Sequence, residues 1–66
     1  MHVTVNGGDR ELPDGLGLVA LLEELGLRPG TVVVERNGEA LVRSELDGVV
    51  LADGDRLELV RAVAGG

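Results

Sequence analysis

The stretch LVALLEELG at residues 18–26 decides the fold, because here the chain takes the period of an amphipathic α-helix. Its leucines recur at i, i+3, i+4 and i+7, at positions Leu18, Leu21, Leu22 and Leu25. Glu23 and Glu24 lie off this apolar stripe, and Gly26 is a typical residue to end a helix. Gly17 precedes the stretch as a weak N-cap. We therefore expect one helix that buries a single face.

The residues before the helix predict a β-hairpin. Residues 2–6 alternate polar and apolar side chains, which is the period of a half-buried strand. Asn6-Gly7-Gly8-Asp9 is a turn sequence, since glycine supplies the positive φ that tight turns demand. Residues 10–12 read as a short return strand that ends at Pro13-Asp14-Gly15.

The residues after the helix predict further strands. Residues 31–36 are rich in β-branched side chains, residues 37–39 form a turn, and residues 40–42 pair back briefly. Residues 43–51 are irregular, with a single helical turn near residues 44–46, and Asp53-Gly54-Asp55 leads into a last strand from Arg56. This order predicts an α+β fold, a ubiquitin-like β-grasp with a four- to five-stranded mixed sheet and one helix packed across it.

Strand alternation divides the side chains of this sheet between two faces. We expect the helix to cover Val3, Val5, Val32, Val34, Leu57 and Leu59. The opposite face then carries Val33, Glu58, Val60 and Ala62. Apolar residues on an uncovered face, close to the end of the sequence, predict a surface at which a partner protein docks.

Composition excludes several classes of function. With 66 residues the chain forms one domain, and its net charge of −6, with six Arg scattered singly, argues against a nucleic-acid partner. No apolar run approaches membrane-spanning length and no signal peptide is present, so we expect a cytoplasmic protein with no membrane partner. There is no Cys, and the one His is His2, so we expect no metal site and no bound cofactor.

Catalytic constellations are missing as well. None of the twelve acidic residues is predicted to lie in a buried acid/base pair, and Ser44 has no His near it in sequence. Residues 15–20, GLGLVA, match the G-x-G-x-x-A dinucleotide fingerprint. The strand before them is the second arm of a hairpin, however, and no parallel βαβ unit follows, so a turn at Gly15 and a helix entry at Gly17 explain the match. The chain is predicted to be a substrate or carrier for enzymes and not an enzyme.

The sequence stops at Gly65-Gly66, shortly after the last strand. We expect a β-grasp domain over residues 1–63 and a flexible tail over residues 64–66. Two glycines make a thin peptide that enters a narrow cleft, and an activated glycyl carbonyl is the least hindered acyl group that a protein offers. Ala64 and Gly65 would thread into a partner's active site, which leaves the carboxylate of Gly66 as the reacting group. A frayed terminus is the alternative interpretation.

Motifs spread along the chain resemble those of a known family. They are Asn37-Gly38-Glu39, Arg43-Ser44-Glu45, DGDRLELV at residues 53–60, and Ala64-Gly65-Gly66. Their order, together with the length and the terminal Gly-Gly, resembles the ThiS sulfur carriers of thiamin biosynthesis, within the wider ThiS/MoaD-like group. The chain departs from the residues usual in that family at Val42, Leu46 and Ala62.

The resemblance implies a two-step activation of Gly66. An E1-like adenylyltransferase joins its carboxylate to AMP from ATP, so ATP is used by the activating enzyme and is not a cofactor of this chain. Sulfur from a persulfide or sulfide, supplied by a cysteine desulfurase or another sulfide source, then displaces AMP and leaves a thiocarboxylate. The thiocarboxylate donates its sulfur to an acceptor enzyme, which in the thiamin pathway is thiazole synthase.

Alternative functions remain open at this point. Related carriers serve molybdopterin, cysteine, tRNA thiolation and natural-product pathways, and a ubiquitin-like modifier would pass the activated Gly66 to a lysine of another protein. A small interaction module would use the sheet and ignore the tail. The absence of Cys and Lys favours a sulfur carrier, because no thiol holds sulfur elsewhere and the one amine that the chain offers is that of Met1.

Overall fold

The computed structural model describes residues 1–61 of the chain. Its elements, in chain order, are β1 (His2–Val5), β2 (Gly8–Glu11), α1 (Leu18–Glu24), the 3₁₀ helix η1 (Pro29–Thr31), β3 (Val32–Arg36), β4 (Glu39–Leu41), the 3₁₀ helix η2 (Arg43–Gly48) and β5 (Arg56–Arg61). This is the predicted order of strands and helix, with the brief return strand at residues 39–41 present.

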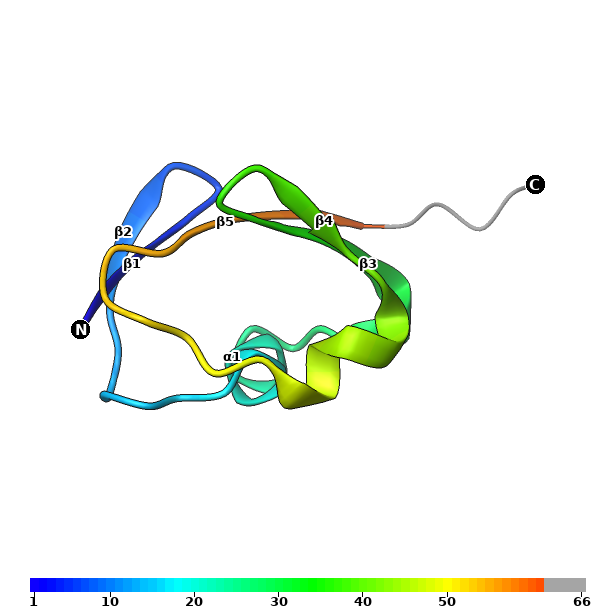
Figure 1. Ribbon diagram of the computed structural model, residues 1–66, viewed down its shortest axis with the longest axis horizontal. Helices are drawn as coiled ribbons and strands as arrows, with labels where there is room; N and C mark the ends of the chain where they lie inside the picture. The colour runs from blue at the N-terminus through cyan, green and yellow to red at the C-terminus, as the bar shows by residue number, and fades with distance from the viewer. Residues whose placement is uncertain (62–66) are drawn as a thin grey trace.

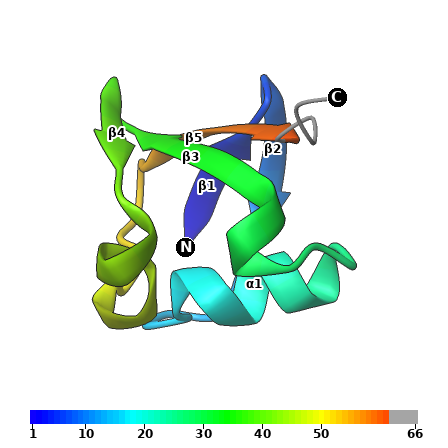
Figure 2. The same ribbon diagram turned by 90° about the vertical axis from the view of Figure 1, so that its right-hand side faces the viewer.

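The strands form one mixed sheet with the order β2-β1-β5-β3-β4. β1 and β5 pair in parallel at the centre, and the other neighbours are antiparallel. The helix α1 lies across one face of this sheet, and η2 lies beside it on the same side (Figures 1 and 2). The predicted α+β architecture, a β-grasp with one helix on a mixed sheet, is therefore confirmed.

Both hairpins turn on an Asn-Gly pair. Asn6 and Gly7 have φ of 49° and 82°, and Asn37 and Gly38 have φ of 53° and 86°. Positive φ at both central residues is the two-residue hairpin turn whose twist matches the flanking strands. The sequence prediction assigned positive φ to glycine alone. Because Asn6 already turns the chain, β2 begins at Gly8 and the return strand starts two residues earlier than expected.

The helix ends where its sequence predicts. Gly17 precedes it with an extended backbone and no side-chain cap, as expected of a weak N-cap. Leu25 is the C-cap, and Gly26 follows with φ of +74°, the left-handed conformation that stops a helix. Of the four leucines in the stripe, Leu18, Leu21 and Leu22 are fully buried and Leu25 is partly buried.

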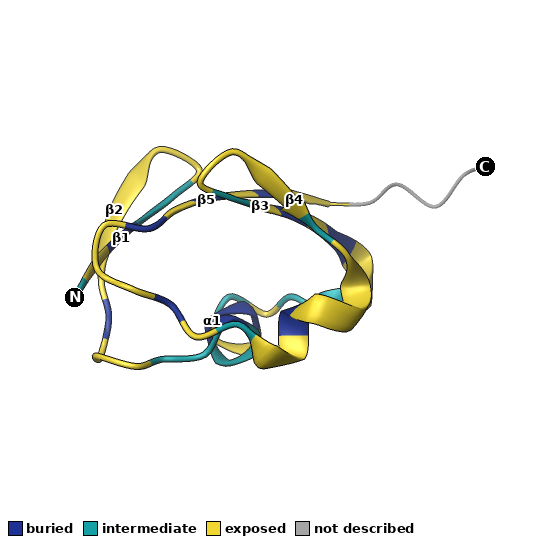
Figure 3. Cartoon of the chain, in the orientation of Figure 1, coloured by how far each residue is buried: buried dark blue, intermediate teal, exposed yellow. Residues whose placement is uncertain are grey.

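The core lies between α1 and the sheet. All six residues expected on the covered face belong to it or pack against it, with Val5 only partly buried. The segment between β4 and β5, expected to hold a single helical turn, forms η2 and contributes Leu46, which is 2% exposed. Figure 3 shows buried residues in α1, β3 and β5, whereas β2 and most of β4 at the sheet edges are exposed.

Candidate functional site

The sheet face that α1 does not cover carries an apolar row near the end of β5. Val33 of β3 and Val60 of β5 are direct cross-strand partners, and they are 49% and 61% exposed. Val42 directly follows β4, and continuing by one residue the register that pairs Val34 with Leu41 sets it across from Val33. Val42 is also exposed, so three valines, on β5, on β3 and directly after β4, form this row.

We call this surface, made of Val33, Val42 and Val60, the valine row. Sequence alternation placed Val33 and Val60 on the uncovered face, but it missed Val42, whose position depends on how the second hairpin pairs. A contiguous exposed apolar patch on a small domain is a typical protein–protein contact surface, unlike a single exposed side chain.

An acidic border lies beside the valine row. Glu35 of β3 pairs directly with Glu58 of β5, and both side chains are exposed. Two like charges opposite each other on neighbouring strands destabilise a sheet. Neither glutamate has an ion-pair partner within residues 1–61. The uncovered face therefore offers an apolar strip with negative charge along one side, which suits a partner surface that is apolar with a basic rim.

The predicted tail residues come shortly after β5 in the sequence. β5 ends at Arg61, one residue after Val60, and the chain continues with residues 62–66. Ala62, predicted to lie on the docking face, and Ala64, Gly65 and Gly66, predicted to form the reactive tail, lie outside the described residues. The division into a domain over residues 1–63 and a tail over residues 64–66 therefore stays a prediction.

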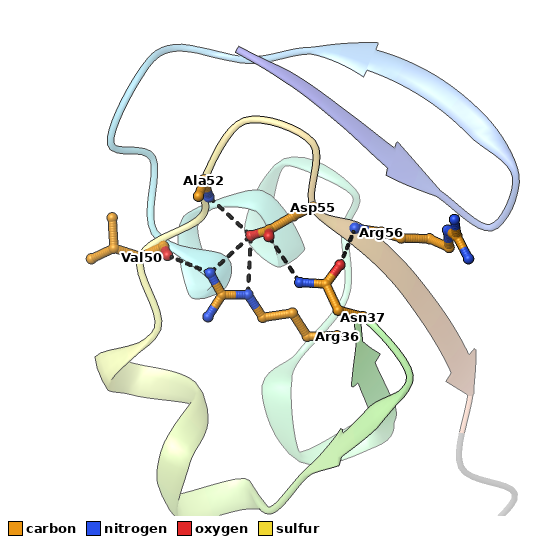
Figure 4. Close-up of polar contacts among 6 residues, drawn as sticks. All are labelled: Arg36, Asn37, Val50, Ala52, Asp55 and Arg56. Atoms are coloured by element: carbon orange, nitrogen blue, oxygen red, sulfur yellow. Dashed lines mark hydrogen bonds and ion pairs between the residues drawn. The ribbon is translucent and has the colours of Figure 1, made fainter.

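A buried carboxylate holds two loops of the structure together. Asp55, which is 6% exposed, accepts hydrogen bonds from Arg36 Nε at 3.0 Å, Asn37 Nδ2 at 3.1 Å and the Ala52 N–H at 2.9 Å, and Arg36 Nη2 lies 2.9 Å from its Oδ2 (Figure 4). No pattern in the sequence predicted a buried carboxylate at this position. Its partners are the Arg36 guanidinium, the Asn37 amide and the Ala52 N–H, and no second acid is among them. The network around Asp55 therefore serves structure and not acid/base chemistry.

The environment of Asp55 keeps its carboxylate ionised. Burial by itself raises the pKa of this group, but the hydrogen bonds from Ala52, Asn37 and Arg36 and the positive charge of Arg36 outweigh that effect. The net result is a pKa of Asp55 below its ordinary value. The network extends further, because Arg36 Nη2 donates to the carbonyl of Val50 at 3.1 Å.

Other kinds of site can be examined over the same residues. Within residues 1–61, no three His, Cys, Asp or Glu side chains are grouped to hold a metal ion, and no helix is long and apolar enough to cross a membrane. The glycines of the dinucleotide-like stretch have local roles, since Gly15 sits in a turn with φ of +78° and Gly17 is the N-cap of α1. The strand before them is one arm of the antiparallel β1–β2 hairpin.

Comparison with known families decides the relationship. The sequence model of the ThiS family matches residues 3–66, nearly the whole chain. This chain belongs to the ThiS family. The valine row, β5 and the residues that follow it all fall inside the match.

Solved structures agree with this assignment. The crystal structure of the thiamine biosynthesis protein ThiS from Geobacter metallireducens is 35% identical, with a TM-score of 0.84, and the match covers 100% of both chains. The solution structure of a thiamine biosynthesis protein from the same organism is also 35% identical, with a TM-score of 0.79 over 100% of this chain and 88% of that one.

Two curated relatives carry a different name. Proteins named thiazole synthase from Paramagnetospirillum magneticum and Magnetococcus marinus are 39% and 36% identical to this chain over all of its 66 residues. The chain spans about one fifth of the length of each of them.

Two of the motifs that resemble those of the ThiS family are joined by hydrogen bonds in the structure. Asn37 of the first motif donates to Asp55 of the later one, and the N–H of Arg56 donates back to Asn37 Oδ1 at 2.9 Å. These residues are far apart in sequence, but the network joins the β3–β4 turn to the start of β5. The network therefore fixes the start of β5, the strand from which the chain continues to Gly66.

Proposed function

We propose that this chain is a sulfur carrier of thiamin biosynthesis and that the carboxylate of Gly66 carries the sulfur. The observation that supports this most strongly is the ThiS family match, which extends through the terminal Gly-Gly. The two solved relatives share this fold and are named for thiamine biosynthesis, which points to the same pathway.

The proposed chemistry has two steps. The Gly66 carboxylate attacks the α-phosphorus of ATP on an adenylyltransferase, which forms an acyl-adenylate and releases pyrophosphate. Hydrosulfide then attacks the acyl carbon, a C–S bond forms, the bond to AMP breaks, and a thiocarboxylate remains. If the sulfur arrives as an enzyme persulfide, the acyl disulfide that forms must be cleaved by a thiol. A chain without Cys has no thiol of its own for this purpose, so the partner supplies it.

In this proposal the folded body positions the tail. The valine row and Glu58 dock on the adenylyltransferase, whose surface would be apolar with basic groups at its rim. β5 contributes Val60 to the row and leads directly into Ala62, so docking fixes the direction in which the tail leaves the domain. Ala64 and Gly65 then thread toward the reacting centre, where small side chains permit a close approach.

We further propose thiazole synthase as the sulfur acceptor. In two relatives of that name, a region similar to the whole of this chain occupies one fifth of the polypeptide. A carrier-like region and a protein named thiazole synthase thus share one chain in those organisms. Covalent linkage of this kind raises the effective concentration of one partner at the other, which is useful where the two act together.

Mass spectrometry tests the proposal. The protein is co-expressed with its adenylyltransferase and a cysteine desulfurase, and its intact mass is compared with that of protein expressed alone. We expect one oxygen to be replaced by sulfur in the C-terminal peptide. That peptide should also gain one adduct from an alkylating agent, although the chain has no Cys.

A shortened chain that ends at Ala64 is the control, and it should gain neither sulfur nor adduct. An isopeptide bond from Gly66 to a lysine of another protein would replace the carrier proposal with that of a ubiquitin-like modifier. An unchanged mass in the presence of an active adenylyltransferase would refute both.

A further inference from the structure

A hollow lined by two arginines lies at the end of β5, on the other side of the sheet from the valine row. Its lining residues are Gly26, Leu27, Arg28, Thr31 and Arg61. They come from the connection that follows α1, from η1, and from the last residue of β5. Figure 2 looks at this end of the molecule, where β5 stops above the turn that follows α1.

Strand alternation explains why Arg61 faces the hollow. Leu57 and Leu59 point toward α1 and are buried, and Arg61 is the next residue of that series. The helix ends at Glu24 and Gly26 turns the chain, so no helix remains to cover a side chain at this position. A leucine here would be exposed, and the sequence has an arginine instead.

The hollow gathers positive charge in a chain that is acidic overall. Arg28 and Arg61 are both exposed, and Arg43 Nε lies 3.7 Å from the point that a Cβ on Gly30 would occupy, beside η1. Three of the six arginines are therefore near the end of β5. Within residues 1–61 the ion pairs involve the Met1 amine, His2 and Arg36, and none of these three arginines.

The backbone around the hollow is held by local hydrogen bonds. The Thr31 hydroxyl and the Thr31 N–H both donate to the carbonyl of Arg28, at 2.7 Å and 2.9 Å. The Leu27 N–H donates to the carbonyl of Leu22 at 2.8 Å, which anchors the other side to the helix. The two guanidinium groups thus project from a fixed frame, and their donors are not used by the chain's own carboxylates among the described residues.

We propose that this hollow binds a carboxylate side chain of the enzyme that receives the tail, at the mouth of that enzyme's tail-binding channel. The inference rests on the proposed function. Arginine pairs with carboxylates through two parallel hydrogen bonds, so two arginines that line one hollow can fix an acidic residue in position and direction. The tail base is then held on both sides, by the valine row on one face of β5 and by the arginine hollow on the other.

The length of the tail separates a partner carboxylate from the phosphate of the nucleotide. Five residues follow Arg61 in the sequence, and five extended residues reach about 17 Å. The adenylate forms at Gly66, so its phosphate lies at the far end of that reach when the tail is extended into a channel. The hollow lies at the other end of the tail, beside Arg61. There the domain meets the surface of the partner and not its reacting centre.

Charge reversal of each arginine tests the inference. The variants R28E and R61E are compared with R10E, which makes the same charge change on the exposed edge strand β2, at the opposite end of the molecule (Figure 1). Adenylation by the cognate enzyme is measured through the pyrophosphate that it releases, at about 0.05 M and about 0.5 M salt. Thermal melting of each variant checks that the fold is kept.

We expect R28E and R61E to raise KM about three- to tenfold at low salt, with kcat unchanged, because rim charges act mainly on association. The increase should shrink at high salt, where exposed charges are screened. R10E should behave like the parent. Equal KM values for R28E, R61E and R10E, with a parent that is adenylated normally, would overturn the inference and leave the proposed function intact.

A second measurement tests whether the hollow binds a phosphate instead. The Arg28 and Arg61 Nε–H resonances are recorded by NMR while inorganic phosphate or AMP is added to the free protein. No shift below about millimolar concentration is expected for a site that recognises a protein carboxylate in the complex. Saturable shifts at lower concentration would assign the hollow to a phosphate and overturn the proposal. A parent that is not adenylated at all would instead refute the proposed function.

Discussion

Replacement of Asp55 by Asn should destabilise the fold while changing only one atom and one charge. In the parent, Asp55 Oδ2 accepts from Arg36 Nε and from the Ala52 N–H and forms an ion pair with Arg36 Nη2, and Oδ1 accepts from Asn37. An amide keeps one of these oxygens. Its NH2 group must then face a donor, either Asn37 Nδ2 or the Arg36 and Ala52 donors together.

The cost follows from the less damaging of the two orientations. With the amide oxygen at the Oδ2 position, one hydrogen bond to Asn37 is lost at about 0.5–1.5 kcal/mol, and the charge-assisted bonds from Arg36 weaken by a similar amount. Asn37 has little freedom to turn over, because its own oxygen accepts from the Arg56 N–H. We therefore expect D55N to lower the free energy of unfolding by about 1–3 kcal/mol.

Removal of the whole group should cost more. D55A leaves a partly buried Arg36 without its partner, for which about 3–5 kcal/mol is usual. A chain of 66 residues has a total stability of about 3–10 kcal/mol, so D55A should be partly unfolded at physiological temperature. Urea unfolding followed by circular dichroism measures both variants, with D47N as a control, since Asp47 is exposed and has no hydrogen bond to its side chain within residues 1–61.

The same network predicts a pH dependence. The folded-state pKa of Asp55 lies below its unfolded value, so its stabilisation is present above the unfolded pKa of about 3.9 and is lost as the pH falls through the folded pKa. The stability difference between parent and D55N should be flat from about pH 7 to pH 5 and shrink below about pH 4. A D55N variant as stable as D47N at pH 7, or a difference that grows on acidification, would refute this account.

Three further predictions address the core, the docking face and the tail. L21A or L22A should lose about 2–5 kcal/mol in chemical denaturation, because both side chains are fully buried, and parent-like melting would contradict that packing. V60D should fold normally but raise KM for adenylation, whereas V50D, equally exposed outside the valine row, should not; equal kinetics would move the interface elsewhere. A chain that ends at Ala64 should melt like the parent yet accept no AMP, and G66A should be adenylated more slowly, because a methyl group crowds the reacting carbonyl.

Local signals in the sequence were sufficient for much of the fold. The leucine period placed α1 to within a residue, and alternation placed the buried residues of β3 and β5, because a helix or strand that covers one face of a sheet imposes a fixed period. The first hairpin was misplaced by two residues, since Asn6 adopts the positive φ that was assigned to glycine. Asn-Gly and Gly-Gly are both favoured central pairs of a two-residue turn, and Asn6-Gly7-Gly8-Asp9 offers both, so the turn residues alone did not fix the register.

The site was harder to predict, because its parts depend on pairing between distant strands. Alternation alone gave Val33, Glu58 and Val60 the correct face, but Val42 joins them only through the register of β3 with β4. Asp55 looked like an ordinary turn residue, and its burial follows from the approach of the β3–β4 turn. Arg61 continues the series of β5 residues that face α1. An arginine is tolerated there because α1 ends before it could cover this position, which the sequence of β5 alone does not show.

The place of β5 in the sheet has a consequence for synthesis of the protein on the ribosome. β5 is the central strand, paired with β1 on one side and β3 on the other, yet it is the last of the described elements to be translated. Until it emerges, the two hairpins have no common partner and α1 has no complete sheet to cover. We therefore expect the nascent chain to remain largely unfolded through most of translation, because its sheet needs contacts between the β1 and β5 segments, and contacts of such long sequence separation slow folding. A partner that reads the folded surface would then engage the chain only after β5, which leads into the tail, has been made.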